Sequence, residues 1–356
     1  MGRAKEAAAE ALTAAVNGAT RAVAPADIAG PSGSAELLET LRTETPSSKH
    51  ARARLPGPVR FALAVVLSFA LSTLGRSFVD TYSQNEVGTI TREENSQAEF
   101  GLALAWFGDY DGFDVAALAL LSHVTLMRMI QTFLLSVFYG IRPLTAGAYL
   151  AVDVVSAFWP FLLLRRLSGA HSAAPGVPNR DIVADRGIQV LTSLQSALIY
   201  SVVLFLGSRY LLPNSLVLYF QGIPTIMPAT DAAFLGLGSP VTQVLSLLCG
   251  LAARSFIFTP TVTTPQTSED QKNAEFDPVN ATLGQTLAWN LWGYTTRTKV
   301  SLIRTAVAML FTAVGTYLDT ALVIKGVEPC GATVYAGLWV IAALVTGLSL
   351  RYTGSI

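Results

Sequence analysis

Residues 187–211 read GIQVLTSLQSALIYSVVLFLGSRYL, and this stretch decides the fold class. No charged side chain lies between Arg186 and Arg209. A helix needs roughly 20 mostly apolar residues to cross the hydrocarbon core of a bilayer. The stretch is therefore predicted to be a transmembrane helix.

Similar apolar segments recur along residues 56–356, which are expected to form one transmembrane helical domain. The set of segments is about 59–76, 114–139, 144–164, 187–211, 240–258, 303–324 and 333–350. The composition agrees, because the 356 residues are 51% hydrophobic and only 13% charged, against roughly 25% charged in soluble domains. We expect an all-α polytopic bundle with about seven hydrophobic helices, six or seven of them spanning. The first is the open case, since Arg60 and Arg76 bound a short uncharged stretch that fits a short span or an interfacial helix.

Residues 1–55 form a separate block rich in Ala, Thr, Ser, Glu and Arg. Without a series of large apolar residues it cannot build a core, so a mobile polar tail is predicted. A mitochondrial transit peptide is the weaker alternative, because Glu6, Glu10 and Asp27 add acidic groups that such peptides avoid. No apolar core of a secretory signal lies near Met1. The default location is the endoplasmic reticulum or another endomembrane.

Two polar regions interrupt the apolar segments. Residues 77–113 form a predicted acidic loop, in which Asp109 and Asp111, with Asp114 just beyond, weakly resemble a calcium-binding loop. The match lacks the longer ligand series and terminal Glu of an EF-hand, so a solvated acidic surface is favoured. Residues 259–302 form a predicted polar loop plus an interfacial helix, because Trp289 and Trp292 precede basic residues as they do at membrane interfaces.

Lys and Arg mark the cytosolic side of short loops. Loop 165–186 contains four arginines and loop 259–302 contains Lys272, Arg297 and Lys299, whereas loop 212–239 contains no Lys or Arg. The first two loops and the C-terminus are therefore predicted to be cytosolic. The tail is also basic, yet seven spans would place it opposite the C-terminus. The orientation of the N-terminus stays open between six and seven spans.

Ionisable side chains at membrane depth cost several kcal/mol unless they are paired or hydrated, so each is a candidate site. The candidate intramembrane polar site comprises His123, Arg128, Asp153, Arg254 and Asp319. On the structural interpretation Arg128 pairs with Asp153 or Asp319 and joins helices. On the functional interpretation these groups line a polar cavity for a small solute, an ion or a lipid headgroup.

Motifs for catalysis are missing: the sequence has no G-x-S-x-G elbow, H-E-x-x-H pair, phosphate loop or C-x-x-C pair. The chain has only two cysteines and three histidines, and no histidine follows His171, so no catalytic residue, metal site or cofactor is predicted. The 24 basic and 24 acidic residues balance, so no nucleic-acid partner is expected. The favoured function is a non-catalytic scaffold, adaptor or accessory subunit in a lipid bilayer, with protein partners on the tail and cytosolic loops. The alternative is a transporter, channel or lipid-handling protein.

Overall fold

A computed structural model describes residues 56–84, 86–88, 90–91, 98–121, 129–172, 176–227 and 240–354. The elements of this part of the chain are helices, and two isolated β-bridges join its loops, so the predicted all-α class is confirmed. The predicted mobile tail, residues 1–55, lies outside the described residues.

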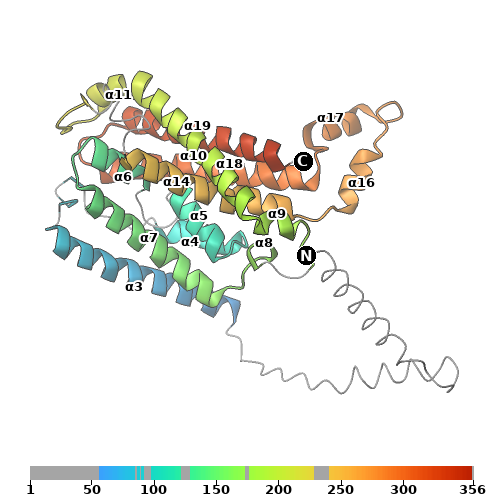
Figure 1. Ribbon diagram of the computed structural model, residues 1–356, viewed down its shortest axis with the longest axis horizontal. Coiled ribbons are helices and arrows are strands. Elements are labelled where there is room, and N and C mark those ends of the chain that lie inside the picture. The colour runs from blue at the N-terminus through green and yellow to red at the C-terminus, as the bar shows by residue number, and fades with distance from the viewer. Residues whose placement is uncertain are drawn as a thin grey trace, which may run out of the picture. The chain divides into compact units, whose positions relative to one another are not determined.

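Six runs of helix in the described part of the chain are long and apolar enough to cross a membrane (Figure 1). They are α3 (Gly57–Ser83), α7 (Pro143–Leu164), α10 (Arg186–Tyr210), the run of α14 (Pro240–Ala253), η1 (Arg254–Phe258) and α15 (Thr259–Thr263), the run of α18 (Thr296–Leu318) and η2 (Asp319–Val323), and α19 (Pro329–Gly354). These runs are consistent with a multi-pass integral membrane protein. The first predicted segment is a 27-residue helix, long enough to span.

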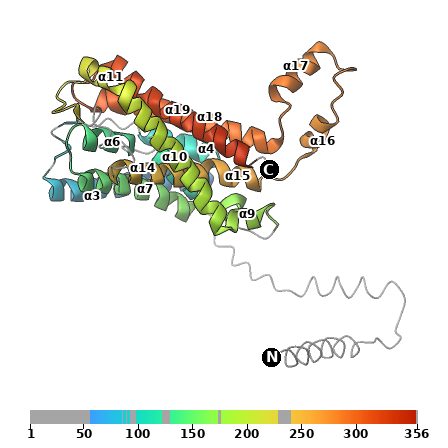
Figure 2. The same ribbon diagram turned by 45° about the horizontal axis from the view of Figure 1, so that its top comes forward.

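The outer helices turn small polar residues inward and large apolar residues outward. On α3, Ser68 and Ser72 are buried, whereas Phe69, Leu74 and Phe78 are exposed. This pattern is the reverse of a soluble helix and suits a surface that faces lipid tails, with small residues at helix–helix contacts. The interior is built around aromatic rings, among them Trp339 with Phe133 and Tyr200. Helix pairs α18/α19, α10/α14 and α3/α7 form the main contacts (Figure 2).

The helices run between two ends of the bundle. We call "terminal end" the end that holds Pro56, residues 165–172 and 176–185, residues 264–295 and Gly354. The opposite end is the "far end". At the far end the Lys325 N–H donates to the Ile90 carbonyl at 3.1 Å, and Gln221 N–H donates to Gly326 at 2.8 Å. A short helix there, α11 (Leu212–Tyr219), packs on α19, consistent with the apolar, proline-broken stretch that follows α10.

The prediction that residues 77–113 form a loop is wrong, because this stretch contains the end of α3 and a second helix, α4 (Ala98–Phe107). Thr91 pairs with Ile324 at the far end. Trp106 lies beside Phe61 at the terminal end, with ring centroids 5.6 Å apart. The chain therefore returns to the terminal end before α5 begins. The sequence hid this return because α4 is only ten residues long and follows a run of carboxylates.

The predicted segment 114–139 is described as two short helices, α5 (Gly112–Leu121) and α6 (Met129–Val137), with 122–128 outside the described residues. Together they carry the chain from the terminal end to the far end, where the Tyr139 hydroxyl donates to the Gln221 carbonyl. With the return through α4, both Pro56 and Gly354 lie at the terminal end. This path removes the conflict between the basic tail and the basic C-terminus.

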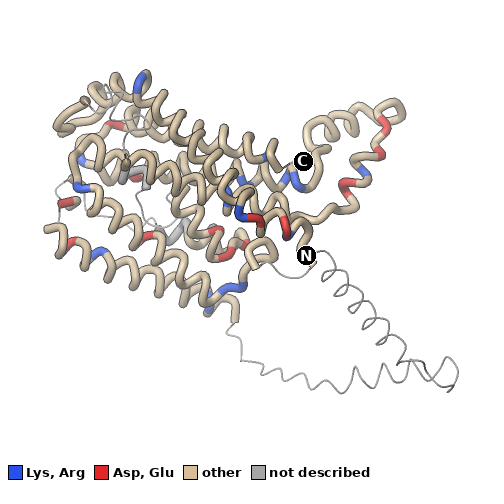
Figure 3. Tube along the Cα trace, in the orientation of Figure 1, with Lys and Arg blue, Asp and Glu red and all other residues tan. Residues whose placement is uncertain are grey.

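Basic residues gather at the terminal end (Figure 3). In the described part of the chain this end carries Arg60, Arg165, Arg166, Arg180, Arg186, Arg254, Lys272, Arg297, Lys299, Arg304 and Arg351, whereas the far half carries Arg76, Arg142, Arg209 and Lys325. The positive-inside rule accordingly favours a cytosolic terminal end.

The polar region before α18 contains α16 (Ser268–Ala274) and α17 (Leu283–Trp292). A capping box between Thr282 and Gln285 fixes where α17 begins. No residue of α17 is buried, and its Leu283, Leu287 and Leu291 form an exposed stripe at four-residue spacing. The predicted surface helix ahead of the sixth segment is thus present.

Candidate functional site

The structure describes three of the five sequence-predicted polar residues, Asp153, Arg254 and Asp319. His123 and Arg128 lie outside the described residues, so the pairing predicted for Arg128 stays a prediction. Asp153 on α7 is buried and forms an ion pair with Arg76 on α3, with N and O atoms 3.1 Å apart. Asp319 begins η2 toward the far end, whereas Arg254 begins η1 toward the terminal end. Asp153 therefore joins two helices, and Arg254 belongs to a different neighbourhood from Asp319.

A buried charged cluster lies instead at the terminal end, where α5 begins. Asp111 and Asp114 are each only 1% exposed. The interpretation of this region as a solvated acidic surface is therefore wrong for these two residues. It holds for Asp109, which is 96% exposed in its side chain and bound to Arg165. The cluster was invisible in the sequence because its partners come from residues 60 and 190 positions away.

Local sequence explains why Asp111 and Asp114 stand together. The backbone N–H of Asp114 donates to Asp111 Oδ1 at 2.9 Å, and the Asp111 N–H faces Asp114 Oδ2 at 3.5 Å. This reciprocal arrangement caps the first turn of α5, where the helix dipole also favours negative charge. From the neighbouring loop the Ser168 N–H donates to Asp111 Oδ2 at 2.9 Å.

His171, on the one-turn helix α8 (Gly169–Ser172), completes the cluster. Its Nδ1 lies 2.8 Å from Asp111 Oδ2. Burial alone would lower the pKa of His171, but the hydrogen bond and charge of Asp111, with the charge of Asp114 behind it, raise that pKa above the ordinary value. Burial would likewise raise the pKa of Asp111, and the hydrogen bond and charge of His171 with two backbone N–H donors lower it instead.

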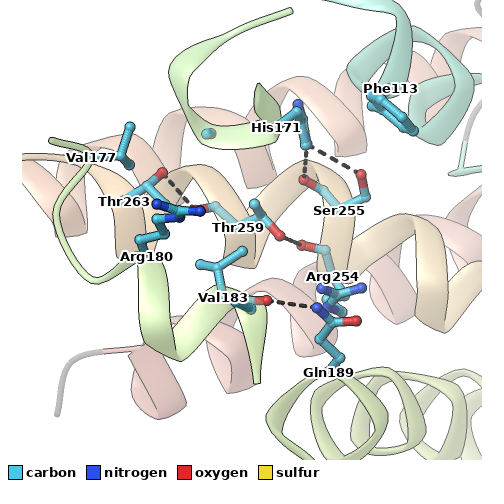
Figure 4. A pocket seen from close by; sticks show the side chains of 12 residues that line it. Phe113, His171, Val177, Arg180, Val183, Gln189, Arg254, Ser255, Thr259 and Thr263 are labelled. Carbon is cyan, nitrogen blue, oxygen red and sulfur yellow. Dashed lines mark hydrogen bonds between the residues drawn. The ribbon is translucent and has the colours of Figure 1, made fainter. Parts of the chain in front are cut away.

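The second ring nitrogen of His171 points at Ser255 on η1 (Figure 4). Nε2 lies 3.4 Å from the Ser255 hydroxyl and 3.3 Å from the Ser255 carbonyl oxygen. Ser255 occupies a π-helical turn, a distortion that is frequent at functional sites.

A cavity of about 300 Å³ opens beside this contact. Its wall combines α5, α8, η1 and α15 with α9 (Arg180–Ala184) and the start of α10, as Figure 4 shows. The lining residues are Phe113, Ala170, His171, Val177, Arg180, Val183, Ala184, Gln189, Arg254, Ser255, Thr259 and Thr263. None of these twelve residues is an Asp or Glu, so the wall carries two guanidinium groups and no carboxylate.

Most neutral donors of this wall are already used. The Thr263 hydroxyl donates to the Thr259 carbonyl at 2.8 Å, and the Thr259 hydroxyl donates to the Arg254 carbonyl at 3.3 Å. The Gln189 amide donates to the Val183 carbonyl at 2.7 Å. The two guanidinium groups, Arg180 and Arg254, are therefore the donors that a guest in the cavity would meet.

Asp111, Asp114 and His171 place possible metal-ligand atoms within 4.8 Å of one another. However, both oxygens of Asp114 already accept hydrogen bonds from Arg304, at 2.6 and 3.3 Å. The guanidinium neutralises that carboxylate and would repel a cation. The arrangement is an ion-pair network among side chains and needs no metal to balance its charge.

No protein-family model, curated protein or solved structure matches this chain.

Proposed function

We propose that this protein is a multi-pass membrane protein that binds an anionic guest, a phosphate- or carboxylate-bearing lipid headgroup or small solute, in the cavity at the terminal end. The observation that carries the proposal is the pairing of Arg180 and Arg254 on one cavity wall that holds no carboxylate. Arginine forks match the planar oxygens of carboxylate and phosphate.

The position of Arg254 strengthens the argument. It belongs to the spanning run Pro240–Thr263 and is only partly exposed, so its charge is poorly hydrated. A cation at such a position is stabilised by an anion, and the other residues of the cavity wall are neutral or basic. The volume suits a headgroup or a small solute, since ligand sites span roughly 300–1,000 Å³.

This proposal develops the lipid-handling alternative predicted from the sequence. The adaptor function, through residues 1–55 and the predicted cytosolic loops, stays a prediction. So does the location in the endoplasmic reticulum or another endomembrane. Binding in the cavity and recruitment by the tail would occupy different parts of the chain, and they can be tested separately.

The test is a binding titration of the full chain in nanodiscs, with inorganic phosphate as the soluble probe and phosphatidylglycerol against phosphatidylcholine as the lipid probes. Arg254→Gln should weaken binding by about 10- to 100-fold, because a charged hydrogen bond contributes about 1.5–3 kcal/mol. Arg180→Gln should act in the same direction, with a smaller effect because its side chain is exposed.

Arg186→Gln is the matched control, because Arg186 is exposed, lies near the cavity in sequence and does not line it. Preference for phosphatidylglycerol with no phosphate binding would identify a lipid headgroup, and phosphate binding alone would identify a solute. Equal affinities in Arg254→Gln and Arg186→Gln would overturn the proposal.

A further inference from the structure

We propose that Ser255, His171 and Asp111 form a nucleophile–base–carboxylate relay that hydrolyses a carboxylic ester bearing an anionic group. The identity of the substrate rests on the proposed function of the cavity. The chemistry of the relay stands on the geometry of the three side chains.

The three groups stand in the order that acyl transfer requires. Asp111 Oδ2 lies 2.8 Å from His171 Nδ1, and His171 Nε2 lies 3.4 Å from the Ser255 hydroxyl. The second distance is longer than an ideal hydrogen bond, as is common before a substrate is bound. Serine, histidine and aspartate reach this arrangement on unrelated folds and in any chain order, so it is recognised by geometry. This is why no sequence motif predicted the relay.

The relay is held by three separate elements. Asp111 is fixed by the first turn of α5 and by the Ser168 N–H, and it is nearly inaccessible to water. It therefore keeps the proton of the imidazole on Nδ1 and leaves Nε2 facing the cavity. Ser255 and His171 both line that cavity, so a bound ester would reach the hydroxyl.

The Ser255 carbonyl competes for the same nitrogen. Nε2 lies 3.3 Å from this oxygen, so a protonated imidazole can donate to the carbonyl. When that proton leaves, Nε2 has a free lone pair and can only accept, which directs it to the hydroxyl. The relay should therefore be active when His171 is neutral and inactive when His171 is protonated.

The reaction balances with water as the second reactant. The Ser255 oxygen attacks the ester carbonyl carbon while its proton passes to His171 Nε2. The bond from that carbon to the alcohol oxygen then breaks, and the alcohol leaves with the proton from Nε2. Water attacks the acyl-serine in the same way, and it releases the carboxylic acid and restores the hydroxyl.

The cavity defines the class of ester. Arg180 and Arg254 would hold the anionic group, and Phe113 and Val177 offer apolar contact to the rest of the guest. Neutral esters should react by the same relay with weaker binding.

The charged groups that face His171 set its pH dependence. Asp111 and Asp114 come from α5, Arg254 from η1 and Arg180 from α9. Burial lowers the pKa of His171, and the hydrogen bond and charge of Asp111 with the charge of Asp114 raise it. With the carboxylates prevailing, hydrolysis should rise with pH through a midpoint above 6.5.

The test uses the purified full chain in nanodiscs with a fluorophosphonate probe, whose site of attachment is read by mass spectrometry. The neutral substrate is p-nitrophenyl butyrate, the soluble anionic one is mono-4-nitrophenyl succinate, and the lipid one is phosphatidylglycerol. We expect labelling at Ser255, and a loss of at least 100-fold in turnover for Ser255→Ala and His171→Gln. Ser172→Ala is the matched control, since Ser172 is exposed beside His171 and its hydroxyl donates to the Gly169 carbonyl at 3.4 Å.

Ser255→Ala removes one oxygen and should leave thermal stability unchanged, which separates chemistry from folding. Arg254→Gln should lower turnover of the anionic esters while butyrate is still cleaved. No label on Ser255, or equal turnover in Ser255→Ala and the parent chain, overturns the relay even if phosphate binds. Labelling and butyrate cleavage without anion binding would support the relay and overturn the proposed guest.

Discussion

Arg304 on α18 donates hydrogen bonds to both carboxylate oxygens of Asp114 on α5, with N–O distances of 2.6 and 3.3 Å. The same guanidinium donates to the Phe256 carbonyl of η1 at 2.8 Å and lies over the rings of Tyr110 and Phe256. One side chain thus joins three elements around the candidate site. Removing this guanidinium should cost much stability, because its partner carboxylate is almost inaccessible to water and would stay buried without a counter-charge.

Arg304→Leu should destabilise the bundle strongly. The change leaves Asp114 buried without its counter-charge, and breaking a buried pair on one side costs about 3–5 kcal/mol. Thermal unfolding of the chain in detergent measures the loss. Adding Asp114→Leu to Arg304→Leu should recover most of it, and failure of the double variant to recover would show that Arg304 acts mainly through Phe256 and its ring contacts.

Lys299→Ala supplies the comparison for an exposed pair. Lys299 binds Glu269 at 3.0 Å, but the Glu269 side chain is 66% exposed. Such pairs contribute about 0–1 kcal/mol. A loss similar to that of Arg304→Leu would contradict the distinction drawn between the two ion pairs.

The long helices could be predicted from the sequence because each is long and apolar enough to cross a bilayer by itself. Segment 187–211 became α10 (Arg186–Tyr210) and segment 144–164 became α7 (Pro143–Leu164), within one residue at each end. Apolar length is a local property, and it needs no knowledge of neighbours. Short helices such as α4 lack that signal, which is why the return of the chain to the terminal end was missed.

The candidate site could not be predicted because it depends on distant contacts. Asp111 and His171 are 60 positions apart, and Asp114 and Arg304 are 190 apart. Arg254 was identified as a charge near the end of a span, and it does line the cavity. Its neighbours Ser255 and Arg180 carry no local mark, since serine and arginine are common at helix ends. Asp153 was also identified, and its observed partner Arg76 was known only as the boundary of a segment.

The His171–Asp111 pair should make stability depend on pH. The pKa of His171 is raised in the folded protein, so its contribution is full below pH 6.5 and is lost as pH rises through the folded value. The pKa of Asp111 is lowered, so its contribution is full above about pH 4 and lost on acidification. The thermal unfolding midpoint, measured from pH 5 to 9, should therefore decrease as the pH rises toward 9.

Asp111→Asn tests the cause of that fall. It removes the charge that raises the pKa of His171 and replaces the carboxylate with a weaker, neutral acceptor, while burial still lowers that pKa. The decline should shift to lower pH, and overall stability should drop. An unshifted profile in Asp111→Asn would assign the pH dependence to another group.

Close packing of α10 against α14 should make Gly250 sensitive to substitution. A Cβ at this position would clash with the Ser193 carbonyl oxygen, and backbone cannot move aside as a side chain can. Gly250→Ala should therefore cost about 1–3 kcal/mol through overpacking. Gly147→Ala is the control, since a Cβ there meets nothing within 4 Å. Equal unfolding temperatures for the two variants would show that α10 and α14 can separate freely.

The two native cysteines test the path of the chain. Cys330 is exposed at the start of α19, at the far end, whereas Cys249 is buried in α14. A membrane-impermeant maleimide should label only Cys330, and only from the side opposite to the terminal end. Cys330→Ala should abolish labelling, and Thr353→Cys in that background should be labelled from the terminal side.

Because loop 264–295 shares the terminal end, Asn280 of the sequence Asn-Ala-Thr should then remain unglycosylated if that end is cytosolic. Labelling of both positions from one side would contradict the crossing of α19, and a glycosidase-sensitive mass shift lost in Asn280→Gln would place the basic terminal end in the lumen.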